Sequence, residues 1–219
     1  MSLEVIEIET GPAPTASMIV LHGLGADGND FVPIAQQIDM AGIGPMRFIF
    51  PHAPTMPVTI NGGYVMRAWY DILGADLVRR EDESGLRKSQ AMVDALIAKE
   101  RSRGVDASRI VLAGFSQGCA MTLMTGLRSQ ERLAGLVGLS GYLPLADKLA
   151  VERSPANGDV PIFLAHGRMD PVIPIARATA SRDALLALGH PVEWHEYPMA
   201  HSVCAQEVAD LQQWLARLL

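Results

Sequence analysis

The sequence predicts an α/β fold, in which a mostly parallel β-sheet is covered by helices on both faces. Runs of aliphatic and β-branched residues alternate along the chain with longer runs of helical periodicity, which is typical of parallel strands joined by helices. The chain has 219 residues, 49% of them hydrophobic, which is enough for one large core. No linker-like tract and no internal repeat interrupts it, so we expect a single domain over residues 1–219.

The expected strands are short apolar runs. The first, 5–8, is expected at an edge of the sheet, and the second, 18–21, is fully apolar. The others follow at 47–50 (closed by Pro51), 109–113, 136–139, 161–165 and 192–197.

Helices are expected between these strands. They are predicted over 31–38, 84–103, a buried run at 119–124, 176–188 (ended by Gly189), and a C-terminal helix with Val208, Leu211, Trp214, Leu215 and Leu218 on one face. Residues 52–83 show no clean periodicity. They predict a long loop, which in a compact domain is usually functional or poorly ordered.

Composition excludes some classes of partner. The formal net charge is -6, and no Lys- or Arg-rich patch is present, so nucleic acid is not expected as a partner. The N-terminus has no signal-peptide pattern. The uncharged run 110–127 contains glycine, serine and threonine and splits into a strand and a helix, so stable membrane insertion is not expected. Two cysteines, Cys119 and Cys204, are too few for a disulfide framework, and we expect a reduced, cytoplasmic protein.

The most informative motif is G-x-S-x-G at 114–118, between the apolar strand 109–113 and an apolar helix. A turn this tight admits only glycine two residues before and two residues after the serine, and it lifts the hydroxyl of Ser116 clear of the backbone. The helix N-terminus beneath the serine favours developing negative charge. The pattern alone also fits an ordinary glycine-rich turn, so further residues must decide.

A serine nucleophile needs a general base. Three histidines follow far enough along the chain: His190, His195 and His201. His195 lies inside the expected strand 192–197, and His190 precedes that strand, at the end opposite to the one where sites of parallel sheets form. His201 follows the strand, at the start of the last helix, and is therefore the predicted base.

The base needs an orienting carboxylate, which in this arrangement lies between serine and histidine in the chain. Asp170 follows the strand 161–165, at the same sheet edge as Ser116 and His201. Asp159 precedes that strand and Asp183 lies on a helix, so Asp170 is the predicted acid. The alternative is that Asp170 only caps a turn before Pro171.

Two backbone N–H groups should stabilise the oxyanion. One is expected from Gln117, directly after the serine, and the other from the glycine-rich loop 22–26 that follows the strand 18–21. We assign the second donor to Leu24. The alternative for this loop is a simple glycine turn.

Taken together, these segments resemble the phospholipase/carboxylesterase family, which includes small bacterial carboxylesterases and acyl-protein thioesterases. The resemblance runs from about residue 15 to the C-terminus, and the motifs that carry it are 21–28, 69–72, 114–118, 167–174 and 200–201. It implies an α/β-hydrolase fold without a separate lid domain, a triad of Ser116, Asp170 and His201, and oxyanion donors at Leu24 and Gln117. It also implies ester, thioester or lysophospholipid substrates of short to medium acyl chain, no cofactor and no metal, and the possibility of a homodimer. Cys119 stands where many members have glycine.

The expected activity is that of a carboxylesterase acting through an acyl-enzyme, with an acyl-protein thioesterase or lysophospholipase as the alternative that uses the same residues. A non-catalytic binding protein on the same scaffold is a remote alternative. A metal hydrolase built on His22, His166 and His201 is disfavoured because these residues lack a ligand spacing. Proximity to the motifs predicts an apolar acyl pocket lined by Leu24, Val58, Ile60, Trp69, Leu73, Met169 and Val172. The alternative for each of these residues, Trp69 included, is a place in the packed core.

Overall fold

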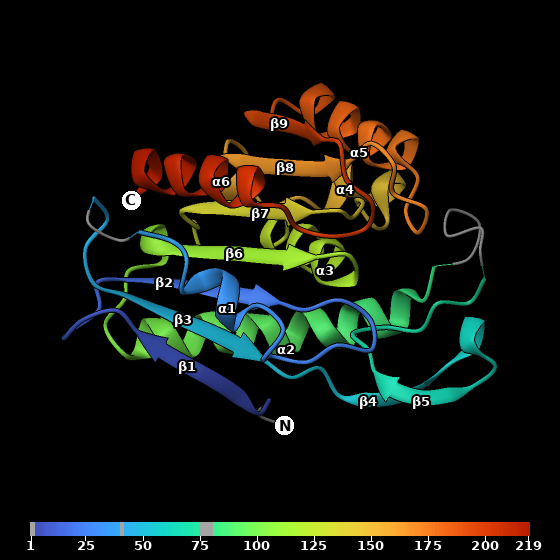
Figure 1. Ribbon diagram of the computed structural model, residues 1–219, viewed down its shortest axis with the longest axis horizontal. Coiled ribbons are helices and arrows are strands. Elements are labelled where there is room, and N and C mark those ends of the chain that lie inside the picture. The colour runs from blue at the N-terminus through green and yellow to red at the C-terminus, as the bar shows by residue number, and fades with distance from the viewer. Residues whose placement is uncertain (1–2, 40–41, 75–80) are drawn as a thin grey trace.

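The computed structural model describes residues 3–39, 42–74 and 81–219. Its centre is a seven-stranded sheet in the order β1-β3-β2-β6-β7-β8-β9 (Figure 1). Its strands are β1 (Val5–Glu9), β2 (Ala16–Leu21), β3 (Met46–Pro51), β6 (Ile110–Phe115), β7 (Gly135–Leu139), β8 (Ile162–Gly167) and β9 (Val192–Tyr197). Edge strand β1 pairs antiparallel with β3, and the other pairs are parallel. The predicted fold class is confirmed.

Helices cover both faces of this sheet. They are α1 (Val32–Ala35), α2 (Glu83–Ser102), α3 (Gln117–Gly126), α4 (Ala146–Glu152), α5 (Ile175–Ala187) and α6 (Ala205–Leu218). In Figure 1, α1 and α6 lie in front of the sheet, and α2 and α3 lie behind it. Among the described residues, no helix is both long and apolar enough to cross a membrane.

Two apolar cores separate the helices from the sheet. Side chains alternate between the faces along each strand, so Ile19 and Leu21 of β2 join the core under α2 and α3, while Met18 and Val20 join the core under α1 and α6. Because the carboxyl ends of β2, β6, β8 and β9 meet at one edge, residues that follow these strands gather there.

The structure differs from the sequence-based expectations in three places. The helix expected at 31–38 is only the four-residue α1, because the chain after Ala35 continues in tighter turns, with Gln37 N–H bonded to the carbonyl of Ile34 and Ile38 N–H to that of Ala35. The helix α4 was not expected. Residues 75–80 of the predicted loop 52–83 lie outside the described residues. Its described part is not a plain loop, because β4 (Thr55–Val58) and β5 (Tyr64–Arg67) form an antiparallel hairpin around the short 3₁₀ helix η1 (Thr59–Asn61).

The hairpin escaped prediction because most of its side chains are exposed or half-buried and it carries Pro57. Of the eight strand residues only Val58 is buried, so the hairpin has too little hydrophobic alternation to reveal it. Gly62 and Gly63, both at positive φ, close the connection between its strands. Further 3₁₀ helices are η2 (Ala107–Arg109) and η3 (Pro155–Asn157).

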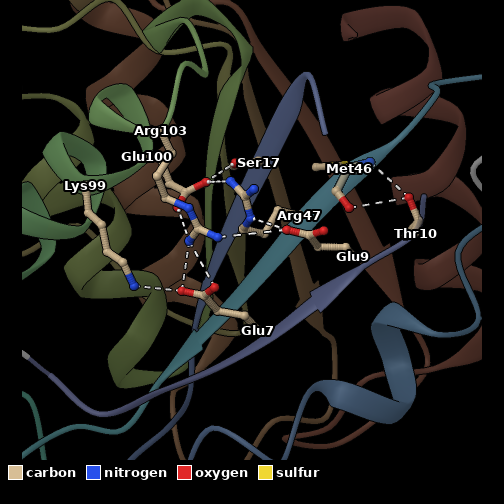
Figure 2. Close-up of polar contacts among 9 residues, drawn as sticks. All are labelled: Glu7, Glu9, Thr10, Ser17, Met46, Arg47, Lys99, Glu100 and Arg103. Carbon is tan, nitrogen blue, oxygen red and sulfur yellow. Dashed lines mark hydrogen bonds and ion pairs between the residues drawn. The ribbon is translucent and has the colours of Figure 1, made fainter. Parts of the chain in front are cut away.

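A polar network fastens the β1 edge of the sheet to α2 (Figure 2). The Arg47 guanidinium on β3 donates to Glu100 on α2 at 2.7 Å and to Glu9 on β1 at 2.9 Å. Ser17 on β2 donates to the same Glu100 oxygen at 2.5 Å. The Glu100 side chain is 1% exposed, and its other oxygen accepts a hydrogen bond from Arg103 at 3.0 Å, so its polar atoms are satisfied by protein donors.

Candidate active site

Ser116 lies in the tight turn between β6 and α3. Its φ of 55° and ψ of -116° are unusual for a residue with a side chain. A Cβ at Gly114 would lie 2.2 Å from the carbonyl oxygen of Gly118, and one at Gly118 would lie 1.9 Å from that of Leu21. Both motif positions therefore require glycine, for the steric reason that the sequence suggested.

The hydroxyl of Ser116 meets the imidazole of His201. The His201 Nε2 lies 2.9 Å from the Ser116 Oγ, and the His201 Nδ1 lies 2.6 Å from a carboxylate oxygen of Asp170. With the proton on Nδ1 donated to Asp170, Nε2 is free to accept the serine proton. The ring of Phe115 packs 4.7 Å from the His201 ring, centre to centre. The structure thus brings the predicted nucleophile, base and acid into one chain of hydrogen bonds.

The position of His201 corrects one detail. It lies in the loop between β9 and α6, four residues before the helix begins at Ala205, and not at the helix start. This loop packs directly on the acid-bearing loop, because a Cβ at Gly167 would lie 2.4 Å from the carbonyl oxygens of Met199 and Ala200. Glycine at 167 therefore permits the approach of the two loops.

The carboxylate of Asp170 is fully buried and well supported. Its second oxygen accepts hydrogen bonds from the backbone N–H groups of Val172 at 2.8 Å and Ile173 at 2.9 Å. These bonds fix the position of the carboxylate that orients the imidazole. His166 braces the same turn, with its Nε2 2.8 Å from the Ile173 carbonyl oxygen and 3.4 Å from the Asp170 carboxylate. Burial lowers the pKa of His166, which favours a neutral ring.

The two predicted oxyanion donors lie on either side of Ser116. The Gln117 N–H is the first of α3, and the first N–H groups of a helix have no partner within it. The Leu24 N–H has no acceptor within the described part of the chain. Its loop passes close to the serine, since a Cβ at Gly23 would lie 3.4 Å from the Ser116 Cβ, and Gly25 turns the chain at a φ of 76°.

Side-chain hydrogen bonds hold this arrangement together. The Gln117 side chain accepts from Trp69 N–H at 2.7 Å and donates to the Tyr70 carbonyl at 2.8 Å. The Trp69 indole donates to the His22 carbonyl at 2.9 Å, and the His22 Nε2 accepts from Ala53 N–H at 3.0 Å. Burial lowers the pKa of His22, in keeping with a ring that accepts a hydrogen bond at Nε2. The residue after the nucleophile is thus tied to the loop that carries Leu24.

A cavity of about 220 Å³ opens beside Ser116. Besides Ser116 and Gln117, it is lined by Leu24, Ile60, Tyr70, Ile72, Tyr142, Val172 and Ile173. Leu24, Ile60 and Val172 were predicted to line it, whereas Tyr70, Ile72, Tyr142 and Ile173 were missed. Tyr142 follows the carboxyl end of β7, a placement that could have pointed to it.

Four predicted lining residues lie elsewhere. Val58 and Trp69 are 0% and 1% exposed and belong to the packed interior, where Trp69 supports the His22 loop. Leu73 and Met169 are 38% and 62% exposed and do not line the cavity. Nearness in the sequence to a motif residue did not determine on which side of the chain each side chain lies.

The histidines weighed as metal ligands have other partners. His22 contacts Gly23 and Ala53, His166 contacts Ile173, and His201 contacts Ser116 and Asp170. Across residues 3–39, 42–74 and 81–219, no group of three or more His, Cys, Asp and Glu side chains is placed to hold a metal ion.

Comparisons with known proteins agree with this geometry. The family model described as Phospholipase/Carboxylesterase matches residues 3–219. Acyl-protein thioesterase 1 of Yarrowia lipolytica is 40% identical over 215 residues, which cover 96% of this chain and 95% of the relative. That of Neurospora crassa is 42% identical over 214 residues, covering 94% and 87%.

Solved structures are similar along nearly the whole chain. Arabidopsis thaliana SOBER1 superposes with a TM-score of 0.88 at 29% identity, over 92% of this chain and 98% of that one. Zea mays acyl-protein thioesterase 2 superposes with a TM-score of 0.86 at 27% identity, over 98% of each chain.

Proposed function

This chain belongs to the phospholipase/carboxylesterase family of α/β-hydrolases, and from that premise we propose that it hydrolyses acyl thioesters and esters through an acyl-enzyme on Ser116. The observation that carries the proposal is the hydrogen-bonded chain from Ser116 through His201 to Asp170. Each of the three groups sits where acyl transfer needs it.

The reaction follows from these contacts. The Ser116 Oγ attacks the acyl carbon while its proton passes to the His201 Nε2, and Asp170 stabilises the imidazolium that forms. The carbonyl oxygen becomes an oxyanion that accepts the N–H groups of Leu24 and Gln117. Collapse breaks the bond to the leaving group, which takes the proton from His201. Water then repeats the sequence on the acyl-enzyme, releasing the carboxylic acid and restoring Ser116.

Thioesters of acylated proteins are the first candidate substrates, ahead of the carboxylic esters favoured by the sequence. The names of the curated relatives support this order, since several are acyl-protein thioesterases. Carboxylic esters are the second candidate, because the family description names carboxylesterases and the same groups act on either bond. Lysophospholipids share the family's chemistry and form a third substrate class for the assay.

The two free cysteines, Cys119 and Cys204, fit the proposed location in a reducing cytoplasm.

The acyl chain is proposed to lie in the cavity beside Ser116. Its walls include five aliphatic residues, Leu24, Ile60, Ile72, Val172 and Ile173. A cavity of about 220 Å³ with this apolar lining suits short to medium acyl chains, which are therefore the expected acyl groups.

Substitution of the nucleophile tests the catalytic assignment. Ser116→Ala should lower kcat for an octanoyl thioester by about three orders of magnitude or more, because the attacking oxygen is gone, while the thermal unfolding curve stays close to that of the wild type. A fluorophosphonate probe should label wild-type protein at Ser116 and leave Ser116→Ala unlabelled. Labelling at another residue, or near-normal turnover by the variant, would refute the assignment.

A matched pair of substrates tests the bond class. One peptide carries the same octanoyl group either on a cysteine sulfur or on a serine oxygen, with the surrounding residues unchanged. The proposal predicts a higher kcat/KM for the thioester. A clear preference for the oxygen ester would make carboxylesterase activity the better description.

A further inference from the structure

Tyr142 stands between the acyl pocket and a second, larger cavity. Its side chain lines the 220 Å³ pocket that contains Ser116. The guanidinium of Arg177 lies over the Tyr142 ring, 3.9 Å from its centre, and Arg177 lines a cavity of about 600 Å³. The next residue along the chain, Leu143, lines that second cavity as well. The ring and the guanidinium stacked on it therefore form a layer that separates the two spaces.

This layer is held in place from several sides. The Tyr142 hydroxyl is 2.8 Å from the hydroxyl of Tyr70, which lines the same pocket. The Leu143 N–H donates to the Ser181 hydroxyl on α5 at 2.9 Å. Tyr142 is only 4% exposed, and a cation stacked on an aromatic face adds a further attraction. These contacts hold the Tyr142 ring in one position at the boundary of the acyl pocket.

The second cavity is lined by apolar and charged side chains. Leu143 and Leu145 are among the apolar ones, and Glu83, Lys148 and Arg177 are among the charged ones. An acyl chain that passed the position of Tyr142 would meet the Arg177 guanidinium stacked on the ring and would find the two leucines as the apolar surface of the cavity.

We propose that Tyr142 determines the acyl-chain length that this protein accepts, by closing the acyl pocket against the neighbouring cavity. The proposal rests on the proposed hydrolase function and assigns a specificity-determining residue to it. Chains that fit the 220 Å³ pocket end against the Tyr142 ring, whereas longer chains clash with it. Without the ring, a long chain gains a path past Leu143 and Leu145 once the Arg177 side chain swings aside.

The test compares chain-length profiles. kcat/KM is measured on acyl thioesters of four to sixteen carbons, kept below their micelle concentrations, for wild type, Tyr142→Ala, Tyr142→Ala/Arg177→Ala, Tyr142→Phe and Arg177→Ala. Wild type should favour chains of eight carbons or fewer. Tyr142→Ala should raise the ratio of kcat/KM for sixteen carbons over eight carbons by roughly tenfold or more, and the double variant should raise it at least as far. Tyr142→Phe keeps the ring, and Arg177→Ala keeps the wall on the pocket side, so both should retain the wild-type optimum.

Two results would overturn the proposal: a wild-type optimum at sixteen carbons, or an unchanged optimum in a folded Tyr142→Ala. Should Tyr142→Ala not fold, Tyr142→Leu removes less volume and must still shift the optimum towards longer chains, and an unshifted Tyr142→Leu overturns the proposal equally. Fluorophosphonate labelling of Ser116 is read separately in every variant. Failure of labelling in the wild type counts against the hydrolase function, whereas normal labelling with unshifted profiles counts against the role of Tyr142 alone.

Discussion

At Ser116 the backbone holds an unfavourable conformation in order to present a hydroxyl. A non-glycine residue at a φ of 55° costs of order 1–3 kcal/mol and persists only where its surroundings enforce it. Here the Ser116 N–H donates to the Leu139 carbonyl of β7, and the flanking Gly114 and Gly118 permit backbone contacts that no Cβ would allow. The strain is therefore held by the packing of β6, α3 and β2.

The side chain of Cys119, at a position where many family members have glycine, is accommodated by two neighbouring glycines. A Cβ at Gly138 would lie 2.8 Å from the Cys119 sulfur, and a Cβ at Gly141 would lie 2.5 Å from it. These two glycines leave the room that a side chain at 119 occupies. Burial raises the pKa of the Cys119 thiol to about 12, so the thiol stays protonated and acts as a small apolar packing group.

The side chain of Gln117 gives a prediction at the same scale. Gln117→Leu keeps the backbone N–H but leaves the Trp69 N–H and the Tyr70 carbonyl without their buried partner. We expect a loss of about 2 kcal/mol or more in the free energy of unfolding, and a fall in kcat of at least roughly tenfold because the loop carrying Leu24 loses its brace. Urea unfolding and steady-state kinetics measure the two effects.

Gln117→Glu is a second test of this prediction. It retains an acceptor for the Trp69 N–H but sets a buried carboxylate oxygen against the Tyr70 carbonyl, so its kcat should fall at least as far as that of Gln117→Leu. Wild-type kcat in a folded Gln117→Leu would show that the hydrogen bonds of the Gln117 side chain to Trp69 and Tyr70 do not position the oxyanion donors.

Among the helices, α6 carries an unusual buried acid. Glu207 in its first turn is 0% exposed, and neither carboxylate oxygen has a hydrogen-bond partner among the residues described. Burial raises the pKa of Glu207 from its ordinary value of 4.5 to about 8. Because the folded state holds this proton more tightly than the unfolded state does, the associated stability is complete below pH 4.5 and is lost as the pH rises through 8.

Glu207→Gln should remove this pH dependence. Between pH 6.5 and pH 9 the wild type should lose about 2 kcal/mol of unfolding free energy relative to the variant, at about 1.4 kcal/mol per pH unit up to the folded-state pKa. This window lies above the pKa of Asp94, which burial raises to about 6, so Asp94 contributes little to the difference. Thermal unfolding of both proteins across the window provides the measurement, and parallel curves would contradict the raised pKa.

At the scale of the whole molecule, the Arg47–Glu100 network joins the first three strands of the chain to the helix α2. It connects β1, β2, β3 and α2 through one buried carboxylate (Figure 2). Arg47→Leu removes the closest cation of Glu100 and leaves it paired with Arg103 at 3.0 Å, so the loss should lie below the roughly 3–5 kcal/mol of a fully unpaired buried charge. Arg47→Leu/Glu100→Leu should recover most of that loss, since a buried ion pair is often replaceable by apolar side chains.

Lys99→Ala is the control for this experiment, because its ion pair with Glu7 is largely exposed and should contribute less than about 1 kcal/mol. Chemical denaturation of the four proteins gives the comparison. A double variant as unstable as Arg47→Leu would mean that the network contributes more than charge compensation.

The homodimer implied by the family resemblance stays a prediction that light scattering can check.

The sequence by itself determined the alternation of strands and helices, the turn around Ser116 and the sheet edge at which Asp170 and His201 lie. These depend on local properties: hydrophobic periodicity, the steric demands of glycine, and the direction of parallel strands. Local periodicity did not reveal the β4–β5 hairpin, because Val58 is the only buried residue of its two strands.

Only the tertiary structure decided which side chains meet. His201 and Ser116 are 85 positions apart in the chain, and Tyr70 and Tyr142 are 72 apart. The lining of the acyl pocket, the wall at Tyr142 and the partners of Glu100 all depend on such distant contacts. They are fixed by how whole elements pack against the sheet, which no local window of residues encodes.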